Sequence, residues 1–170
     1  MLFTPTDKIK ITFTGDDTKQ NPNGYAQVVA GVVQTQRAAY RRFDNIIADL
    51  NYSLPSTNAF DRIIDHDTPW RSLNELGGVS LNADFELGKG TLTSTTAWRY
   101  WNWGPSNDRD FTGLASLSKS QNPARHENWS QEIRYAGEIS DKLSGVVGLF
   151  YINQEVKIRG TEESGDAQWR

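Results

Sequence analysis

The chain has 170 residues, no cysteine and a formal net charge of −3, with a pI near 5.4 and a mean hydropathy of −0.64. The absence of cysteine excludes disulfides and Cys-ligated metal sites, and the acidic balance gives no support for nucleic-acid binding, which needs a basic face. No apolar run approaches the roughly 18–20 residues of a membrane-spanning helix. A hydrophobic fraction of 36% fits a loop-rich soluble protein or part of a β-barrel whose inner face is polar and in contact with water.

The first predicted elements are two strands. Residues 2–4 fit the end of a strand and residues 5–8 fit a turn. In residues 8–19, Ile9, Ile11 and Phe13 alternate with polar residues. A period of two is typical of a strand with one apolar face, so the sequence predicts strands near 2–4 and 8–19.

A long loop is predicted over residues 21–74. Apolar residues from Val29 to Leu50 recur every three to four positions, which favours one or two helices inside the loop. Residues 60–67 fit either a short strand or loop. Arg37, Arg41 and Arg42 belong to this loop and are candidate ligand-facing residues, because clustered cations attract an anionic ligand such as a ferric chelate.

Two long hairpins with the same layout follow. The first pairs residues 78–87 with 91–103 through a turn at Gly88-Lys89-Gly90, and the second pairs 127–137 with 143–157 through a turn near residues 140–142. Residues 104–126, rich in Gly, Pro, Ser and Asn, read as a second long loop, and Arg109 in it is a further candidate ligand-facing residue. Short turns on one side and long loops on the other are what a transmembrane β-barrel requires.

Aromatic residues crowd the second strand of the first hairpin and its predicted neighbours: Trp98, Tyr100, Trp101, Trp103, Trp129, Tyr135, Phe150 and Tyr151. Trp and Tyr prefer the boundary between membrane and water, where the ring is apolar and its N–H or O–H stays hydrated. The cluster therefore favours an aromatic girdle. A soluble sandwich core and a platform that stacks on sugars are the alternatives.

A polar set alternates with the apolar positions of the same strands: Ser80, Asn82, Asp84, Glu86, Arg99, Glu132 and Arg134. Charges of both signs on one face of a sheet can pair across strands. In a barrel these residues would line the lumen, whereas in a soluble sheet they would face solvent. Arg99, Glu132 and Arg134 are the candidate lumen-facing residues.

No constellation for catalysis or metal binding is predicted. His66, between Asp65 and Asp67, has no second ligand at a diagnostic spacing, and neither has His126. The carboxylates of Asp108 and Asp110 fit a solvated turn or a loop salt bridge better than acid–base chemistry. The expectation is that the protein is not an enzyme and holds no cofactor, catalytic residue or metal.

Several stretches resemble the barrel of TonB-dependent outer-membrane receptors. They are residues 78–87 (GVSLNADFEL), 90–99 (GTLTSTTAWR), 129–134 (WSQEIR) and 145–151 (GVVGLFY), together with the opening turn at 2–7. Each motif is short, and their order and spacing make the resemblance fairly specific. Residues 21–74 are its weakest part.

The resemblance implies an all-β fold of antiparallel hairpins that is an internal piece of a large transmembrane β-barrel, with a partly helical long loop. Such barrels have about 22 strands and a plugged lumen, and the chain would hold roughly a quarter of one, over residues 1–170. The resemblance also implies import of a scarce nutrient such as a ferric siderophore through the outer membrane of a Gram-negative bacterium. The implied partners are outer-membrane lipid and the TonB energy-coupling complex, which would act through an N-terminal region that the chain lacks.

The sequence is also compatible with two other functions. A passive porin-like barrel would show the same hairpins, and a soluble all-β carbohydrate-binding module would use the residues from Trp98 to Trp103 to stack on sugars. A separate expectation concerns stability. Because strands cut from a barrel leave open edges, the 170-residue chain is not expected to form a stable native unit without detergent or lipid.

Overall fold

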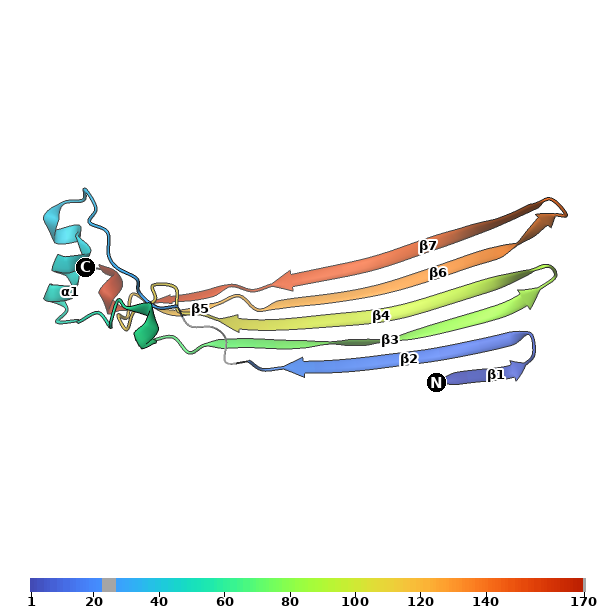
Figure 1. Cartoon of the computed structure of the whole chain (residues 1–170), viewed down its shortest axis with the longest axis horizontal. Coiled ribbons are helices and arrows are strands. Elements are labelled where there is room, and N and C mark those ends of the chain that lie inside the picture. The colour runs from blue at the N-terminus through green and yellow to red at the C-terminus, as the bar shows by residue number, and fades with distance from the viewer. Residues whose placement is uncertain (23–26, 170) are drawn as a thin grey trace. The chain divides into compact units, whose positions relative to one another are not determined.

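The computed structural model describes residues 1–22 and 27–169 and is mostly β-sheet with one short α-helix (Figure 1). Its strands are β1 (Leu2–Thr6), β2 (Ile9–Gln20), β3 (Arg71–Leu87), β4 (Gly90–Ser106), β5 (Leu117–Gln121), β6 (Ala124–Ser140), β7 (Leu143–Ile158) and β8 (Thr161–Ser164). β3, β4 and β6 have 17 residues each, about three times the mean strand length in globular proteins. The chain forms two compact units.

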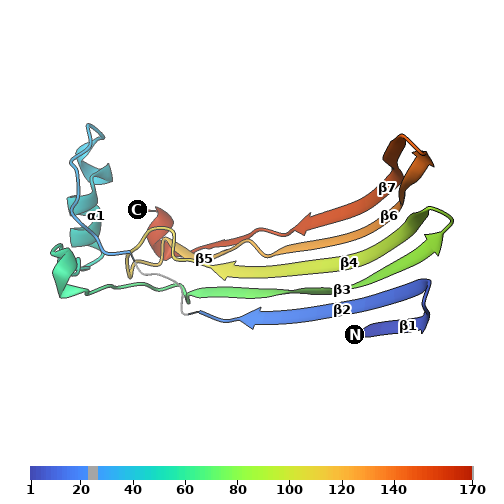
Figure 2. The same cartoon turned by 45° about the vertical axis from the view of Figure 1, so that its right-hand side comes forward.

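Unit 1 comprises residues 1–20, 74–103 and 124–158 and is one antiparallel sheet in the order β1-β2-β3-β4-β6-β7. The long strands lie side by side in both views of the molecule (Figure 1 and Figure 2). The sheet is open: within the described residues, β1 and β7 each have a partner strand on one side only. The closed barrel to which the sequence predicted this chain to belong is therefore not formed by the described residues.

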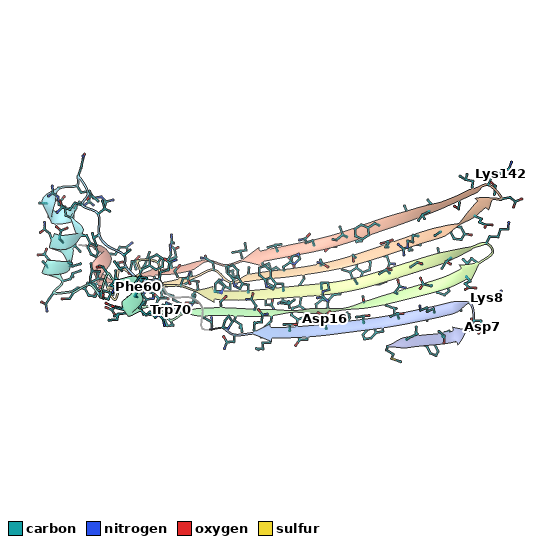
Figure 3. All side chains as sticks on the ribbon, in the orientation of Figure 1. Asp7, Lys8, Asp16, Phe60, Trp70 and Lys142 are labelled. Atoms are coloured by element: carbon teal, nitrogen blue, oxygen red, sulfur yellow. The ribbon has the colours of Figure 1, made fainter. Side chains whose placement is uncertain are left out.

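Short turns join the strands at one end of unit 1. Two-residue turns lie between β1 and β2, between β3 and β4, and between β6 and β7, and Asp7, Lys8 and Lys142 mark this end (Figure 3). Gly88 has a φ of +63°, which a glycine at the first central position of a tight hairpin turn adopts without strain. Glycine at this position thus allows β3 to lead directly into β4.

The register divides the sheet of unit 1 from β2 to β6 into an apolar face and a polar face, whereas β7 carries exposed apolar side chains on both faces, such as Leu149 on one and Phe150 on the other. Ile9 lies opposite Phe85 and Phe13 opposite Leu81, so these residues share one side of the sheet. Thr93 and Thr95 of β4 donate hydrogen bonds to Asp84 and Asn82 of β3 at 2.8 and 2.7 Å, which defines the other side. The apolar face carries Ile9, Ile11, Phe13, Val79, Leu81, Phe85, Leu92, Ile133, Val147 and Leu149.

Large apolar side chains of unit 1 are exposed. Phe13 and Leu81 are each 45% exposed and Leu149 on β7 is 81% exposed, and no hydrophobic residue among those described is buried. A single sheet layer cannot bury either of its own faces. The apolar face therefore has no covering layer within the described part of the chain.

Unit 2 comprises residues 21–73, 104–123 and 159–170, apart from the undescribed positions. It contains the 3₁₀ helices η1 (Ala39–Arg41), η2 (Ala59–Asp61) and η3 (Asp166–Trp169) and the helix α1 (Phe43–Asp49). β5 pairs with β8, with Gln121 opposite Thr161, and the end of β4 pairs with β5 where Ser106 lies opposite Gln121. Unit 2 is thus built from the long segments that connect or follow the long strands.

Each of the six strands predicted from the sequence overlaps a strand of the structure, and α1 lies in the predicted loop helix region. Three details differ. β3 begins at Arg71 rather than near 78, the residues 29–36 predicted to continue a helical face form no helix, and β5 and β8 occupy segments that were expected to be loops. Residues 60–67, left open between strand and loop, contain the end of η2 and irregular backbone. Of the loop predicted from residue 21, positions 23–26 lie outside the described residues.

Candidate functional site

The apolar face of unit 1 ends in a row of aromatic side chains, called here the aromatic row: Trp98, Tyr100, Trp129 and Tyr151. Trp98 lies opposite Trp129 on the neighbouring strand. The Trp98 and Tyr100 ring centroids are 5.3 Å apart, and those of Trp129 and Tyr151 are 5.7 Å apart. These spacings fall within the range of favourable aromatic contacts, so the four rings form two contacting pairs that the register places next to each other across three strands.

Charged residues follow the aromatic row on the same face, towards the strand ends that lead into unit 2: Asp17, Lys19, Glu75, Arg125, Glu127, Glu155 and Lys157. Lys19 forms an ion pair with Glu75, and Arg125 Nε donates to Glu127 Oε1 at 3.0 Å. The order along the strands is therefore apolar, then aromatic, then charged, and on β4 and β6 it is interrupted by Ser94, Thr96 and Gln131, which are hydrogen-bonded to one another before the aromatic row. That order matches the passage from hydrocarbon through an interface to water.

The predicted aromatic cluster is divided between the two faces. Trp101 and Trp103 lie opposite His126 and Ala124 and share the polar face, as does Phe150, which lies opposite Glu132. This corrects the expectation of one girdle, because successive side chains of a strand point to opposite sides. Tyr135 also lies on the apolar face, opposite Leu92, but at the short-turn end, where its hydroxyl donates to the carbonyl of Leu87. Of the predicted cluster, the aromatic row is thus the part that lies together on the apolar face at the long-loop end.

The polar face of unit 1 is connected by hydrogen bonds between side chains. Asp84 accepts from Thr93 and from Asn82 Nδ2, and Asn82 accepts from Thr95. Thr93 and Thr95 in turn lie opposite Arg134 and Glu132 on β6. The hydrogen bonds join β3 to β4, so this part of the polar face is a connected network rather than a set of independent solvated groups.

A pair of glycines on β3 lets side chains of β4 reach β2. Arg99 forms a two-point ion pair with Asp16, one of its hydrogen bonds being 2.9 Å, and Gly78 lies opposite Asp16 on the strand between them. On the other face Tyr100 donates its hydroxyl to Asp17, which lies opposite Gly77. A side chain at either glycine would occupy the path of these contacts.

The three candidate lumen-facing residues share the polar face. Arg99 is joined to Asp16, and Arg134 Nη1 lies 3.8 Å from Glu132 Oε1. The strand register puts Arg99 on the same side as Thr93 and Thr95, and thus on the same side as Arg134 and Glu132. Their grouping on one face follows from the structure, while their exposure to a lumen stays a prediction.

The four candidate ligand-facing arginines all belong to unit 2. Arg42 Nε donates to the carbonyl of Arg37 at 3.1 Å, and Arg41 is the last residue of η1, directly before Arg42. Arg109 is ion-paired with Glu162. The structure therefore brings Arg37, Arg41 and Arg42 close together along one short segment, and it partly neutralises Arg109.

A buried polar centre in unit 2 was not predicted. Asp108 is only 2% exposed, and its Oδ1 accepts hydrogen bonds from the amides of Asp110 and Phe111 at 3.1 and 3.0 Å. Asp110 Oδ1 accepts from Thr112 N and Oγ1, and its Oδ2 accepts from Leu117 N. The two carboxylates thus organise the loop from 108 to 117 by pairing with its backbone N–H groups.

Tyr52 joins two segments of this polar centre. Its hydroxyl donates to Asp65 Oδ2 at 2.9 Å and accepts the amide of Gly113 at 3.0 Å. Burial and the neighbouring carboxylate of Asp65 raise the pKa of Tyr52. Thr68, 3% exposed, adds a second connection by donating to the carbonyl of Leu117.

Some buried atoms of unit 2 have no hydrogen-bond partner: both ring nitrogens of His66, Asp67 Oδ2 and Asp108 Oδ2. Burial, and the nearby negative charges of Asp108 and Asp110, raise the pKa of Asp67. Burial also raises the pKa of Asp108, against the opposing effect of the Phe111 amide. His66 packs edge-on against Trp70, with ring centroids 4.6 Å apart. The centre is therefore a cluster of carboxylates that repel one another, and its side chains are not arranged as ligands for a bound ion.

No metal site forms around these residues. Among residues 1–22 and 27–169, no three His, Cys, Asp or Glu side chains come together in a way that could hold a metal ion. His126 instead lies beside Gln154, with 2.6 Å between His126 Nε2 and Gln154 Nε2.

Sequence reasoning missed the roles of Asp108, Asp110, Tyr52 and the two glycines. The spacing Asp-x-Asp-x-Thr from 108 to 112 carries a signal, because Asp and Thr side chains bond to nearby backbone in turns. Gly77-Gly78 beside an alternating strand also carries one, since glycine inside a strand often marks a close approach of neighbours. Tyr52 has no local signal, because its partners are distant in sequence.

Comparisons with protein-family models, with curated proteins and with solved structures found no match to this chain. In the described part of the chain, no helix combines the length and the apolarity needed to cross a membrane.

Proposed function

We propose that this chain is part of a TonB-dependent outer-membrane transport receptor, a protein that imports a scarce nutrient such as a ferric siderophore and catalyses no reaction. The observation that carries the proposal is the exposed apolar face of unit 1. Leu81, Ile133 and Leu149 are 45%, 47% and 81% exposed on strands long enough to cross a bilayer. Exposing this much apolar surface to water is unfavourable, whereas contact with lipid acyl chains is not.

The dimensions of the sheet support this assignment. A transmembrane strand needs about 9–11 residues, and β2, with 12, is the shortest of the five strands that make up most of unit 1. The apolar stretch of β3 between Val79 and Leu87 has about the length of such a strand. Backbone groups of β3, β4 and β6 are hydrogen-bonded to strands on both sides, as the absence of water in a bilayer requires. The open edge of β7 needs a further strand to meet the same requirement.

The two faces then have distinct roles in the proposed receptor. The apolar face contacts lipid, with the aromatic row at the outer interface, and the polar face lines the lumen with Arg99, Glu132 and Arg134. The long connections that make up unit 2 leave the strands at the ends opposite to the short turns, as the outer loops of such a barrel do. Arg37, Arg41 and Arg42 would there meet an anionic solute, and the TonB complex would supply the energy for import.

The alternatives make different predictions. A soluble carbohydrate-binding module would cover its apolar face with a second layer, and the described residues provide none. A passive porin would have the same sheet but would not depend on energy coupling. We therefore expect that the protein, expressed from its own gene, is found in the outer-membrane fraction and that its solute uptake stops when TonB is deleted.

Single-cysteine labelling tests the topology, because the chain has no native cysteine. We expect a membrane-impermeant maleimide to label Phe60→Cys, at a residue 91% exposed in unit 2, on intact cells. The same reagent should label Lys142→Cys only after the outer membrane is permeabilised. Labelling of both positions on intact cells, or recovery of the protein in the soluble fraction, would refute the proposal.

A further inference from the structure

Two indole rings on the polar face of unit 1 are not explained by contact with lipid. Trp101 and Trp103 of β4 have ring planes 11° apart and centroids 5.9 Å apart, and Trp101 is 38% exposed. They lie on the opposite side of the sheet from the aromatic row. A large apolar ring on a polar face has no role in the girdle, and its exposure leaves it available to a ligand.

Amide and imidazole side chains share the face of this indole pair with apolar residues of β7 such as Val156, which lies opposite His126. Asn74 Oδ1 accepts from Trp101 Nε1 at 3.2 Å, which orients the ring. His126 lies opposite Trp101 and Asn128 lies opposite Arg99, and Gln154 on β7 lies opposite Asn128. The indole pair is thus flanked by amide and imidazole groups from three neighbouring strands.

The nearest charges are already paired with each other. The guanidinium of Arg99 is held by both carboxylate oxygens of Asp16. Opposite charges bound in this bidentate way leave little net field, so the surface does not favour an anion. Its chemistry is that of planar apolar rings beside groups that both donate and accept hydrogen bonds.

We infer that the Trp101–Trp103 pair is a binding surface for a neutral oligosaccharide. The C–H groups on one side of a pyranose ring pack against an indole face, and the ring hydroxyls pair with Asn, Gln and His side chains. This inference rests on the proposed function, in which the polar face lines the lumen, and it adds neutral saccharides as a second class of solute that the receptor binds.

The test uses the protein expressed from its own gene and purified from membranes in detergent. Three probes, maltohexaose, cellohexaose and xylohexaose, are titrated by isothermal calorimetry, with ferric citrate as an anionic probe. We expect at least one hexasaccharide to bind. Trp101→Ala should weaken its binding about tenfold or more, the order of magnitude of one lost aromatic contact, and Trp101→Phe should restore most of the affinity.

Trp98→Ala is the matched control, because it removes the same side chain three residues away on the opposite face. We expect it to leave hexasaccharide binding unchanged. Binding of none of the three sugars, or equal losses in Trp98→Ala and Trp101→Ala, would overturn the inference. Heat-modifiable electrophoretic mobility, measured on every variant, shows whether each remains folded.

The same preparation distinguishes failure of the saccharide inference from failure of the transport proposal. A protein that is recovered in the outer-membrane fraction but binds only ferric citrate overturns the saccharide inference and leaves the transport proposal standing. A protein recovered in the soluble fraction refutes the transport proposal, and with it the lumenal placement of the indole pair, whatever sugar it binds.

Discussion

The guanidinium of Arg99 on β4 is hydrogen-bonded to the carboxylate of Asp16 on β2, although a whole strand lies between them. One of the two contacts, from Nη2 to Oδ2, is 2.9 Å long. The bridge is possible because the intervening residue of β3, opposite Asp16, is Gly78. Tyr100 and Asp17 make the same kind of contact past Gly77 on the other face. The two glycines thus allow side chains of β4 to bond to β2 across β3 on both faces of the sheet.

The first prediction concerns Gly78. A Cβ at this position would lie 2.2 Å from the carbonyl oxygen of Trp98 and 2.7 Å from Arg99 Cδ, so Gly78→Ala must displace backbone as well as the ion pair. We expect a loss of about 1–3 kcal/mol in the free energy of unfolding, measured by urea titration in detergent. The control is Gly15→Ala on β2, where the nearest atom is 3.6 Å away. An equal loss in both variants would contradict the bridging role.

The second prediction concerns the apolar face. Leu81→Arg would place a charge towards lipid, and the cost at the middle of a bilayer is about 2–4 kcal/mol. We expect a smaller fraction of the heat-modifiable, folded form after refolding into phospholipid vesicles. Ser80→Arg, one residue away on the polar face, should refold like the unchanged protein. If Ser80→Arg is the more damaging change, the two faces have been assigned the wrong way round.

The third prediction concerns Tyr52. Tyr52→Phe removes the hydroxyl that Gly113 N–H and Asp65 share and leaves a part-buried amide without its acceptor. The expected effect is a local destabilisation of about 1 kcal/mol, seen as faster amide hydrogen exchange in the peptide that contains Gly113. Tyr40→Phe is the control, because Tyr40 is 71% exposed and should change nothing.

The fourth prediction is a pH dependence of unit 2. Burial raises the pKa of Asp108 and of Asp67 above the ordinary value of 3.8. The folded state therefore binds more protons than the unfolded state at pH values between 3.8 and the raised pKa values. Stability is then highest below that window and falls as the pH rises through it.

Amide exchange in the peptides from 105 to 117, corrected for the intrinsic rate at each pH, measures this effect. Protection should decrease from acidic to neutral pH, and Asp67→Asn should remove part of that decrease, because the neutral amide no longer repels Asp108. Asp49→Asn, an exposed change in α1, should not alter it. Protection that increases with pH would mean that the buried carboxylates are stabilised as anions.

The sequence predicted the sheet of unit 1 because alternation is a local signal. Ile9 to Phe13 and Val79 to Leu87 show the period of two directly, and the tight turn at Gly88 indicates a hairpin. The start of β3 was placed too late, because Asn74, Gly77 and Gly78 have turn-like composition. Their strand conformation comes with pairing to residues 16–20 of β2, and Arg99 and Tyr100 make contacts across the two glycines. No local pattern reveals these distant partners.

The structure of unit 2 was harder to predict, because its elements also depend on contacts between residues that are distant in the sequence. β5 and β8 are polar, four or five residues long and paired only with distant segments, so they carry no periodic signal. The helical spacing from Val29 to Gln36 did not produce a helix, since a short amphipathic segment needs a packing partner to become stable. The buried centre at Asp108 likewise depends on residues from 52 to 117 that converge only in the fold.

Contact of the apolar face with lipid is the central claim and can be measured directly. Leu81→Cys and Ser80→Cys, each carrying a nitroxide, are reconstituted in phospholipid bilayers as single-cysteine variants of the protein. We expect the label at position 81 to collide mainly with dissolved oxygen and the label at position 80 mainly with a water-soluble nickel chelate. Equal access of the nickel chelate to both labels would contradict it, because the apolar face would then be in water.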